Sequence, residues 1–254
     1  FRVDKRLERA VEVNMSDNYV VVCGATGDLP QSVIEEYGLT MIPMTIRLGE
    51  QDYSYDPREE EITCKEFYRQ LKDGAESKTS QITPIVFNDF IINKYISYII
   101  IFFSIFTRFN ILYISFSSGL SGTFNSARLI ASDLAEEYPD RRIECVDSLC
   151  ASIGEGLLCY HAGRMKKEGK SFEEVVAWVQ ENRTNICHWF SVDDLIHLKR
   201  GGRLNSLEAV VGTALKIKPI LSVDKEGKLT VVAKLRGTKK GMEYLKERLI
   251  SDGT

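Results

Sequence analysis

Short apolar runs alternate with amphipathic segments along the first part of the chain. The runs Tyr19–Cys23, Met41–Gly49, Ile111–Phe116 and Arg142–Val146 are typical of buried strands. The segments between them carry helix signals, such as Pro30 in a first turn, Thr63 as a cap and Gly74 as a stop. A further helix is expected from Ile153 to Lys167, and a polar loop from Gln51 to Glu61. This alternation predicts an α/β fold with a parallel sheet.

The pattern changes in the last third of the chain. Ser171-Phe-Glu-Glu174 is a capping box that starts a helix, and Cys187–Val192 resembles a strand. The segment 219–236 then predicts a hairpin with a turn at Asp224-Lys-Glu-Gly227. We therefore expect a Rossmann-like parallel-sheet domain at residues 18–160 and an α+β domain with antiparallel strands at residues 161–254. Residues 1–17 precede or include Met15, a plausible native start, and are interpreted as a leader or an extension added by cloning.

Composition excludes several classes of protein. The chain has 254 residues with a formal net charge of −3, which does not favour nucleic-acid binding. Six cysteines form no C-x-x-C pair, so they are expected to be reduced core residues of a cytoplasmic protein, with no metal site. The apolar run Tyr95–Phe106 is closed by Lys94 and Arg108 and is too short for a membrane span, for which roughly 20 residues are needed.

Glycine and serine motifs for known chemistries are incomplete. Gly24-x-x-Gly27 and Gly154-x-Gly156 do not complete a dinucleotide fingerprint, so packing or turns explain them best. Gly119-Leu-Ser121-Gly-Thr123 resembles a nucleophile elbow, but threonine replaces its last glycine. The three histidines all lie in the second part, and the sequence assigns none of them as a base for Ser121.

Two hydroxyl-rich segments are better candidates for binding. The serine loop (Ser117–Thr123) joins the carboxyl end of a buried strand to a helix N-terminus, and the threonine loop (Thr79–Gln81) precedes another helix. Helix N-terminal amides attract anions, and glycines let the backbone approach a ligand closely. Together the loops could hold a carboxylate or a phosphate, whereas either loop alone could serve as a helix cap.

These and other segments, in order along residues 18–245, carry a resemblance to the DegV family of bacterial fatty-acid-binding proteins. The matching segments are Asp28–Pro30, Ile42–Asp56, Lys78–Gln81, Ser117–Ala127, Val146–Ser148, Val192–Leu195, Leu198–Arg203, Lys216–Ile220 and Lys234–Gly237. The resemblance implies two domains with one long-chain fatty acid buried between them. It also implies that Thr79 and Ser121 contact the carboxylate.

The hydroxyl and amide chemistry of the loops adds Ser80, Ser118 and Gly122 as supporting residues, and the resemblance adds Thr26, the hydroxyl that remains after the first strand. The resemblance further implies a carrier that presents the acyl group to a fatty-acid kinase and is not itself an enzyme, with no cofactor. Arg200 and Arg203, in a compact basic segment, are candidates for docking that kinase. A phosphate-binding regulatory module and a Ser121-dependent hydrolase or acyltransferase are the alternatives.

The chain departs from the family pattern at three places. Gly24-Ala25-Thr26 stands where the family usually has Asp-Ser-Ser. The stretch between Thr79 and Ser121 is longer than usual and contains the apolar run in place of a charged amphipathic helix. Family members also continue beyond the last residues of this chain. We expect residues 91–110 to pack over the acyl tunnel or against a neighbouring subunit. The alternative is that the amino acids given for this segment are not those of the natural protein.

Overall fold

The computed structural model describes residues 18–97, 109–192, 198, 202–203 and 217–253. Its centre is a parallel sheet in the order β2-β1-β6-β7, formed by Thr40–Ile42, Tyr19–Gly24, Asn110–Ser115 and Ile143–Asp147. The fold class predicted from the sequence is confirmed, because this sheet is parallel and the strands near the end of the chain pair antiparallel.

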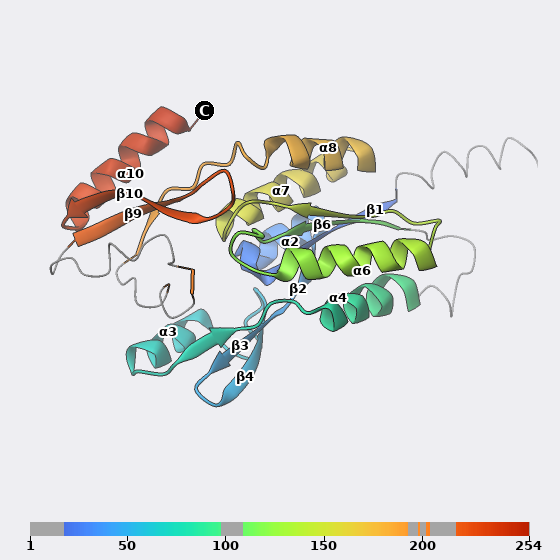
Figure 1. The fold of residues 1–254 in the computed structure, drawn as a ribbon, viewed down its shortest axis with the longest axis horizontal. Coiled ribbons are helices and arrows are strands. Elements are labelled where there is room, and N and C mark those ends of the chain that lie inside the picture. The colour runs from blue at the N-terminus through green and yellow to red at the C-terminus, as the bar shows by residue number, and fades with distance from the viewer. Residues whose placement is uncertain (1–17, 98–108, 193–197, 199–201, 204–216, 254) are drawn as a thin grey trace, which may run out of the picture.

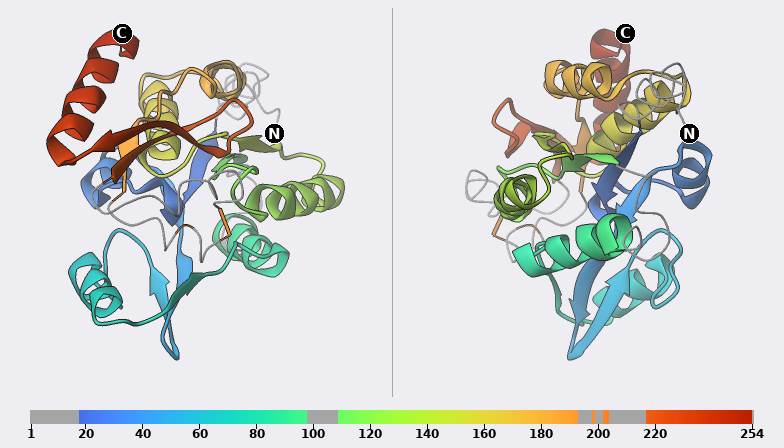
Figure 2. Two further views of the ribbon diagram at one scale, coloured as in Figure 1. Left: turned by 60° about the vertical axis from the view of Figure 1, so that its left-hand side comes forward. Right: turned by 90° about the vertical axis from the view of Figure 1, so that its right-hand side faces the viewer.

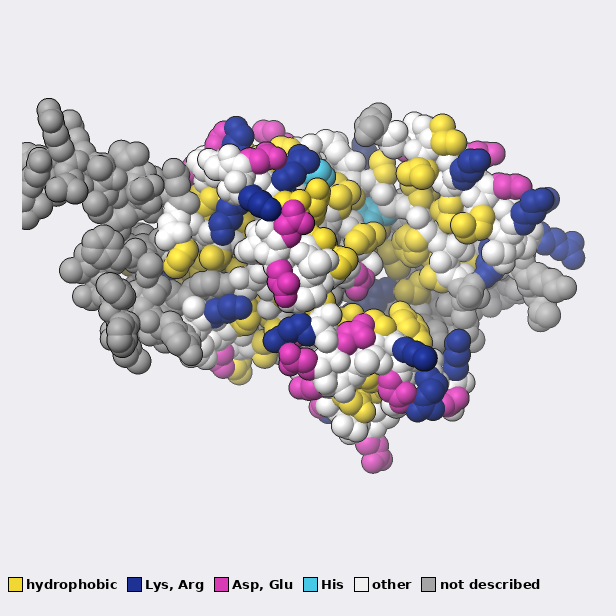
Figure 3. All heavy atoms as spheres, turned by 180° about the vertical axis from the view of Figure 1, so that it is seen from behind, with side chains coloured by type: hydrophobic (Ala, Val, Ile, Leu, Met, Phe, Trp, Pro, Cys, Tyr) yellow, Lys and Arg dark blue, Asp and Glu magenta, His cyan; other side chains and the backbone are white. Residues whose placement is uncertain are grey.

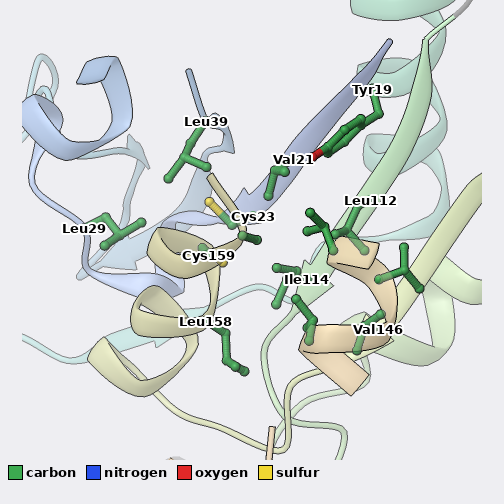
Figure 4. Close-up of a cluster of buried hydrophobic side chains, with 14 of the residues drawn as sticks. Tyr19, Val21, Cys23, Leu29, Leu39, Leu112, Ile114, Val146, Leu158 and Cys159 are labelled. Carbon is green, nitrogen blue, oxygen red and sulfur yellow. The ribbon is translucent and has the colours of Figure 1, made fainter. Parts of the chain in front are cut away.

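Helices cover both faces of the parallel sheet, as Figure 1 shows. One face carries α2 (Gln31–Tyr37), α7 (Ile153–Lys167) and α8 (Phe172–Asn182), and the other carries α4 (Pro84–Ile91) and α6 (Thr123–Glu137). Along β1, Tyr19, Val21 and Cys23 face the first group, while Val20 and Val22 face the second. Figure 4 shows the first of these two cores. The apolar run of β1 thus reflects a strand that is buried on both faces.

A second, antiparallel sheet in the order β4-β3-β5 was not predicted. It consists of Gln51–Tyr55, Met44–Leu48 and Ser77–Thr79, with α3 (Cys64–Lys72) between β4 and β5. The single strand expected over residues 41–49 is divided at Pro43, which has no amide hydrogen for a sheet ladder. The prediction of a polar loop from Gln51 to Glu61 is wrong for its first residues, which form β4. Half-buried Tyr53 and Tyr55 alternate with exposed residues and make β4 an edge strand.

The third sheet, β10-β9-β8, confirms the predicted hairpin. It consists of Leu229–Arg236, Ile217–Val223 and Phe190–Ser191, and α10 (Thr238–Asp252) packs against β9 and β10. Figure 2 shows this unit and the β3–β4 hairpin at opposite ends of the molecule. The described residues also form the short helix η1 (Ala25–Gly27) and the π-helix η2 (Ile92–Ser97), which continues α4.

The domain boundary expected between residues 160 and 161 falls inside α7. Buried residues of α7 and α8, including Leu158 and Val175, share one core with β1 and β6. The sheet face needs both helices as cover, so we propose that the first domain runs to the end of α8. Residues 1–17, expected to be a leader or an added extension, and most of the apolar run lie outside the described residues.

Candidate carboxylate-binding site

The edge where β1 and β6 end is the point at which the sheet topology changes direction. From β1 the chain reaches β2 through α2 on one face, and from β6 it reaches β7 through α6 on the other face. Ligands of open α/β sheets bind in the crevice that such divergence leaves. Buried polar residues also gather at the carboxyl ends of these strands, namely Ser115, Ser117, Asp147, Ser148 and Glu155.

Thr123 joins the two hydroxyl-rich loops at this edge. The Ile82 amide, just after the threonine loop, donates a hydrogen bond to the Thr123 Oγ1 atom at 3.1 Å. The same oxygen lies 3.1 Å from Ser121 Oγ, so the two hydroxyls share a hydrogen bond. Gln81 also lies against Gly122, because a Cβ atom added there would be 2.3 Å from Gln81 Oε1. The structure therefore brings together the neighbourhoods of Thr79 and Ser121.

Within the threonine loop, Thr79 ends β5 and pairs with Ile46 of β3, and its side chain is exposed. Ser80 is exposed too, and its amide donates to the Thr45 carbonyl at 3.1 Å. The short sheet thus fixes the backbone of this loop and leaves both hydroxyl side chains open. The roles of Thr79 and Ser80 toward a carboxylate stay predictions.

The serine loop leads into the N-terminus of α6. Ser121 is half-buried and accepts a hydrogen bond from the Thr123 amide at 3.3 Å, so it also helps to cap the helix. Gly122 precedes the helix and contributes no capping side chain. An anion placed beside Gly122 would meet the positive end of the helix dipole.

Residues distant in sequence hold the serine loop in place. The Ser118 amide donates to Asp147 Oδ1 at 3.1 Å, and the Ser117 hydroxyl donates to the Gly227 carbonyl at 2.7 Å. The β9–β10 turn containing Gly227 thus lies directly on this loop. Arg203 Nε donates to the Leu120 carbonyl at 3.0 Å. Arg203 is therefore a contact of the loop, whatever its part in docking, and Arg200 lies outside the described residues.

Thr26 is engaged with a buried acid. Its hydroxyl donates to Glu155 Oε2 at 2.8 Å, and the Glu155 side chain is fully buried. Burial raises the pKa of Glu155 to about 8, although the hydrogen bond from Thr26 acts in the opposite direction. The structure thus gives Thr26 a partner other than a ligand.

Reasoning from the sequence missed Thr123, Gly227 and Glu155 as parts of this edge. Thr123 carried a usable signal, since it is the last hydroxyl of the serine loop. Gly227 and Glu155 reach the edge only through tertiary contacts, so no local pattern marks them. Among the residues that the structure describes, no group of three or more histidine, cysteine, aspartate or glutamate side chains could hold a metal ion.

Two of the histidines contact groups other than Ser121. His161 packs against the Trp178 ring, with centroids 5.2 Å apart, and His188 Nε2 accepts from the Ala151 amide at 3.5 Å. His197 lies outside the described residues. Neither described histidine is hydrogen-bonded to Ser121, whose hydroxyl instead bonds to Thr123.

Comparison with known proteins gives a consistent result. The DegV family model, described as an uncharacterised protein family, matches residues 18–254. A DegV domain-containing protein of Clostridium perfringens is 38% identical over 231 residues, which are 91% of this chain and 76% of that protein. One from Lactococcus lactis is 37% identical over 235 residues, covering 92% and 77% of the two chains.

Solved structures agree in fold. A DegV family protein from Thermus thermophilus, described by its fatty acid binding, is 31% identical with a TM-score of 0.75, over 92% of this chain and 78% of that one. DegV from Bacillus subtilis, described as a fatty acid binding protein, is 30% identical with a TM-score of 0.76, over 93% and 78%.

The fold places the chain among α/β proteins that combine one parallel sheet with separate antiparallel sheets. Within that class, the match over most of its length shows that the chain belongs to the DegV family.

Proposed function

We propose that this chain binds one long-chain fatty acid between its two domains, with the carboxylate at the threonine and serine loops. The observation that carries the proposal is the Thr123 bridge, which unites both loops beside the N-terminus of α6. Hydroxyls and helix-end amides suit a carboxylate and require neither a metal nor a base. Relatives at 30% and 31% identity are described as fatty-acid-binding proteins, which supports the same ligand class here.

Burial of the acyl tail would supply most of the affinity, at about 0.8 kcal/mol for each CH₂ group. We expect the tail in an apolar tunnel between the domains. The structure also has a surface hollow of about 490 Å³ beside α4, lined by Ile42, Pro43, Val86 and Phe90 among others. That hollow lies beside β2 and α4 and is not the tunnel that we propose.

The first experiment identifies the ligand. Purified protein is extracted with organic solvent, and the extract is analysed by mass spectrometry. A long-chain fatty acid in about equimolar amount supports the proposal, while a phosphorylated metabolite would favour a phosphate-binding module instead. Conversion of an added acyl ester by the protein would favour the hydrolase alternative.

Variants then locate the site. Ser121→Ala and Thr79→Ala should each weaken oleate binding by about 1–3 kcal/mol, since each removes a hydrogen bond to a charged group. Ser251→Ala, at the exposed end of α10, is the matched control and should bind as the wild type does. Unchanged oleate binding in both site variants would place the carboxylate elsewhere.

We further propose that the bound acyl group is presented to a separate fatty-acid kinase, so that this chain acts as a carrier. Arg200 and Arg203 remain the candidate docking residues. Arg203→Ala should lower both oleate binding and acyl-phosphate formation, because its Nε also holds the Leu120 carbonyl. Arg200→Ala should lower only acyl-phosphate formation. Equal turnover by the kinase with the wild type and both variants would contradict the docking role.

A further inference from the structure

The motif Gly154-Glu155-Gly156, left without a role by the proposed function, begins α7 at the same sheet edge. Both glycines allow close approach: a Cβ on Gly156 would lie 2.2 Å from the Gly27 carbonyl oxygen, and one on Gly154 would lie 1.9 Å from His188 Nε2. The backbones of α7 and η1 therefore touch, and they exclude water from the side chain between the glycines. This contact explains why Glu155 has no exposed surface.

Inside this enclosure the Glu155 carboxyl group is incompletely paired. Oε2 accepts the hydrogen bond from Thr26, and the nearby Gly24 backbone also favours the ionised form, but Oε1 has no hydrogen-bond partner of ordinary geometry among the described residues. Oε1 lies beside Gly24, where an added Cβ atom would be 3.7 Å away. A buried carboxylate with one unpaired oxygen is costly, so the neutral acid is the form that this environment accepts.

A short chain of contacts leads from Glu155 to the proposed carboxylate site. The position of a Cβ on Gly24 lies 3.7 Å from Glu155 Oε1 and 3.8 Å from Ile82 Cδ1. Ile82 in turn donates its amide to Thr123, whose hydroxyl bonds to Ser121. The acid therefore lies at the same carboxyl edge of the sheet as the two loops, separated from Ile82 by the Gly24 backbone.

Among the described residues, the one group near Glu155 that could carry a positive charge is His188, which lies against Gly154. Burial lowers the pKa of His188, which favours its neutral form. The other titratable groups near Glu155 are acids, thiols and a phenol, namely Asp28, Cys150, Cys159 and Tyr113. A negative charge on Glu155 would thus be uncompensated and would repel an anion bound above it.

We propose that Glu155 is a positioning residue for the fatty-acid carboxylate, which it supports only while uncharged. The neutral acid holds Thr26 and the Gly24–Gly27 turn beneath the two loops. Its ionisation adds a like charge under the ligand and loosens that turn. This inference rests on the proposed function, because it concerns the same site.

The test measures the affinity of delipidated protein for radiolabelled oleate between about pH 6.5 and about pH 9.5. Wild-type affinity should fall by about tenfold across this range. Glu155→Gln keeps an acceptor for Thr26 and cannot ionise, so it should bind oleate more tightly than the wild type at the upper end. Glu168→Gln removes an acid from the exposed far end of α7 and should keep the wild-type pH profile. Comparison among these three proteins cancels the titration of oleate itself.

A second variant covers the case in which Glu155→Gln does not fold. Thr26→Val removes the hydrogen bond that favours the ionised form of Glu155, and it should move the midpoint of the affinity loss to higher pH. The same pH profile in the wild type and Glu155→Gln, or an unmoved midpoint in Thr26→Val, overturns the positioning role and leaves the proposed function standing. Absence of oleate binding by the wild type at every pH overturns both.

Discussion

The Ile82 amide and the Thr123 hydroxyl are joined by a hydrogen bond of 3.1 Å, although the two residues are 41 positions apart in the sequence. Ile82 lies between β5 and α4, while Thr123 opens α6. Because Thr123 also bonds to Ser121, one buried hydroxyl contacts one proposed carboxylate ligand directly and holds the backbone three residues after the other, Thr79.

Thr123→Val is predicted to weaken oleate binding and to destabilise the fold by about 1–3 kcal/mol. Valine has a similar shape, but it leaves the Ile82 amide without its acceptor. Chemical denaturation and oleate titration measure the two effects. Thr230→Val on β10 is the control and should change neither quantity by a comparable amount. Equal behaviour of the two variants would mean that the bridge has no energetic role.

Gly156→Ala is predicted to destabilise the protein by roughly 1–3 kcal/mol, because its Cβ would overlap the Gly27 carbonyl. Gly241→Ala in α10 makes the same change where the nearest atom is at 3.7 Å. That variant should gain about 0.5–1 kcal/mol from the better helix propensity of alanine. Urea unfolding of both proteins checks the opposite signs, and a loss in both would contradict the packing argument.

The contact between the β9–β10 turn and the serine loop yields another prediction. Gly227 has a φ of +74°, and a Cβ there would be 2.0 Å from Ser117 Oγ. Gly227→Ala should therefore cost more stability than Gly49→Ala, where φ is +62° and nothing lies within 4 Å. Both variants carry the strain of a left-handed residue, so their difference in unfolding free energy reports the contact alone. Gly227→Ala should also weaken oleate binding, and Gly49→Ala should not.

The buried Glu155 predicts how stability depends on pH. Its folded-state pKa of about 8 exceeds the ordinary value of 4.5, so between these values the folded protein holds a proton that the unfolded chain has lost. The contribution of Glu155 to the free energy of unfolding is full below about pH 4.5 and decreases as the pH rises toward about 8, by up to about 1.4 kcal/mol per pH unit. Denaturation series at several pH values should show a smaller slope for Glu155→Gln than for Glu168→Gln. Parallel slopes would mean that Glu155 ionises normally.

The charges on the surface do not mark a binding site in the way that the buried Glu155 does. On the face shown in Figure 3, lysine and arginine side chains are interspersed with aspartate and glutamate. The described ion pairs are largely exposed, such as Arg47 with Asp52 and Lys170 with Glu174. Pairs of this kind contribute little to stability. No helix in the described part of the chain is long and apolar enough to cross a membrane.

The sequence predicted the parallel sheet well because burial on both faces leaves an uninterrupted apolar run, as in Tyr19–Cys23. The sequence also predicted the α8 capping box and the β9–β10 hairpin, because both depend on residues that are close together in the chain. The division of the strand at Pro43 and the edge strand β4 were missed, because half-buried strands give weaker patterns.

The site was predictable only in part. Hydroxyls beside helix starts marked the serine and threonine loops, and the family resemblance singled out Ser121 and Thr79 within them. Glu155 was not predictable, since its burial depends on contact between Gly27 and Gly156. A glutamate on a helix ordinarily faces water, and no nearby residue indicates otherwise.

The pairing of β1 with β6 has a consequence for how the chain folds. Val22 lies opposite Tyr113, and β2 through α4 intervene between them. Local units such as the β3–β4 hairpin can form soon after synthesis, whereas closure of the central sheet requires a long-range encounter, which slows folding. The threonine loop should therefore be structured before the serine loop reaches it, so that a competent binding site appears only with the late arrival of β6.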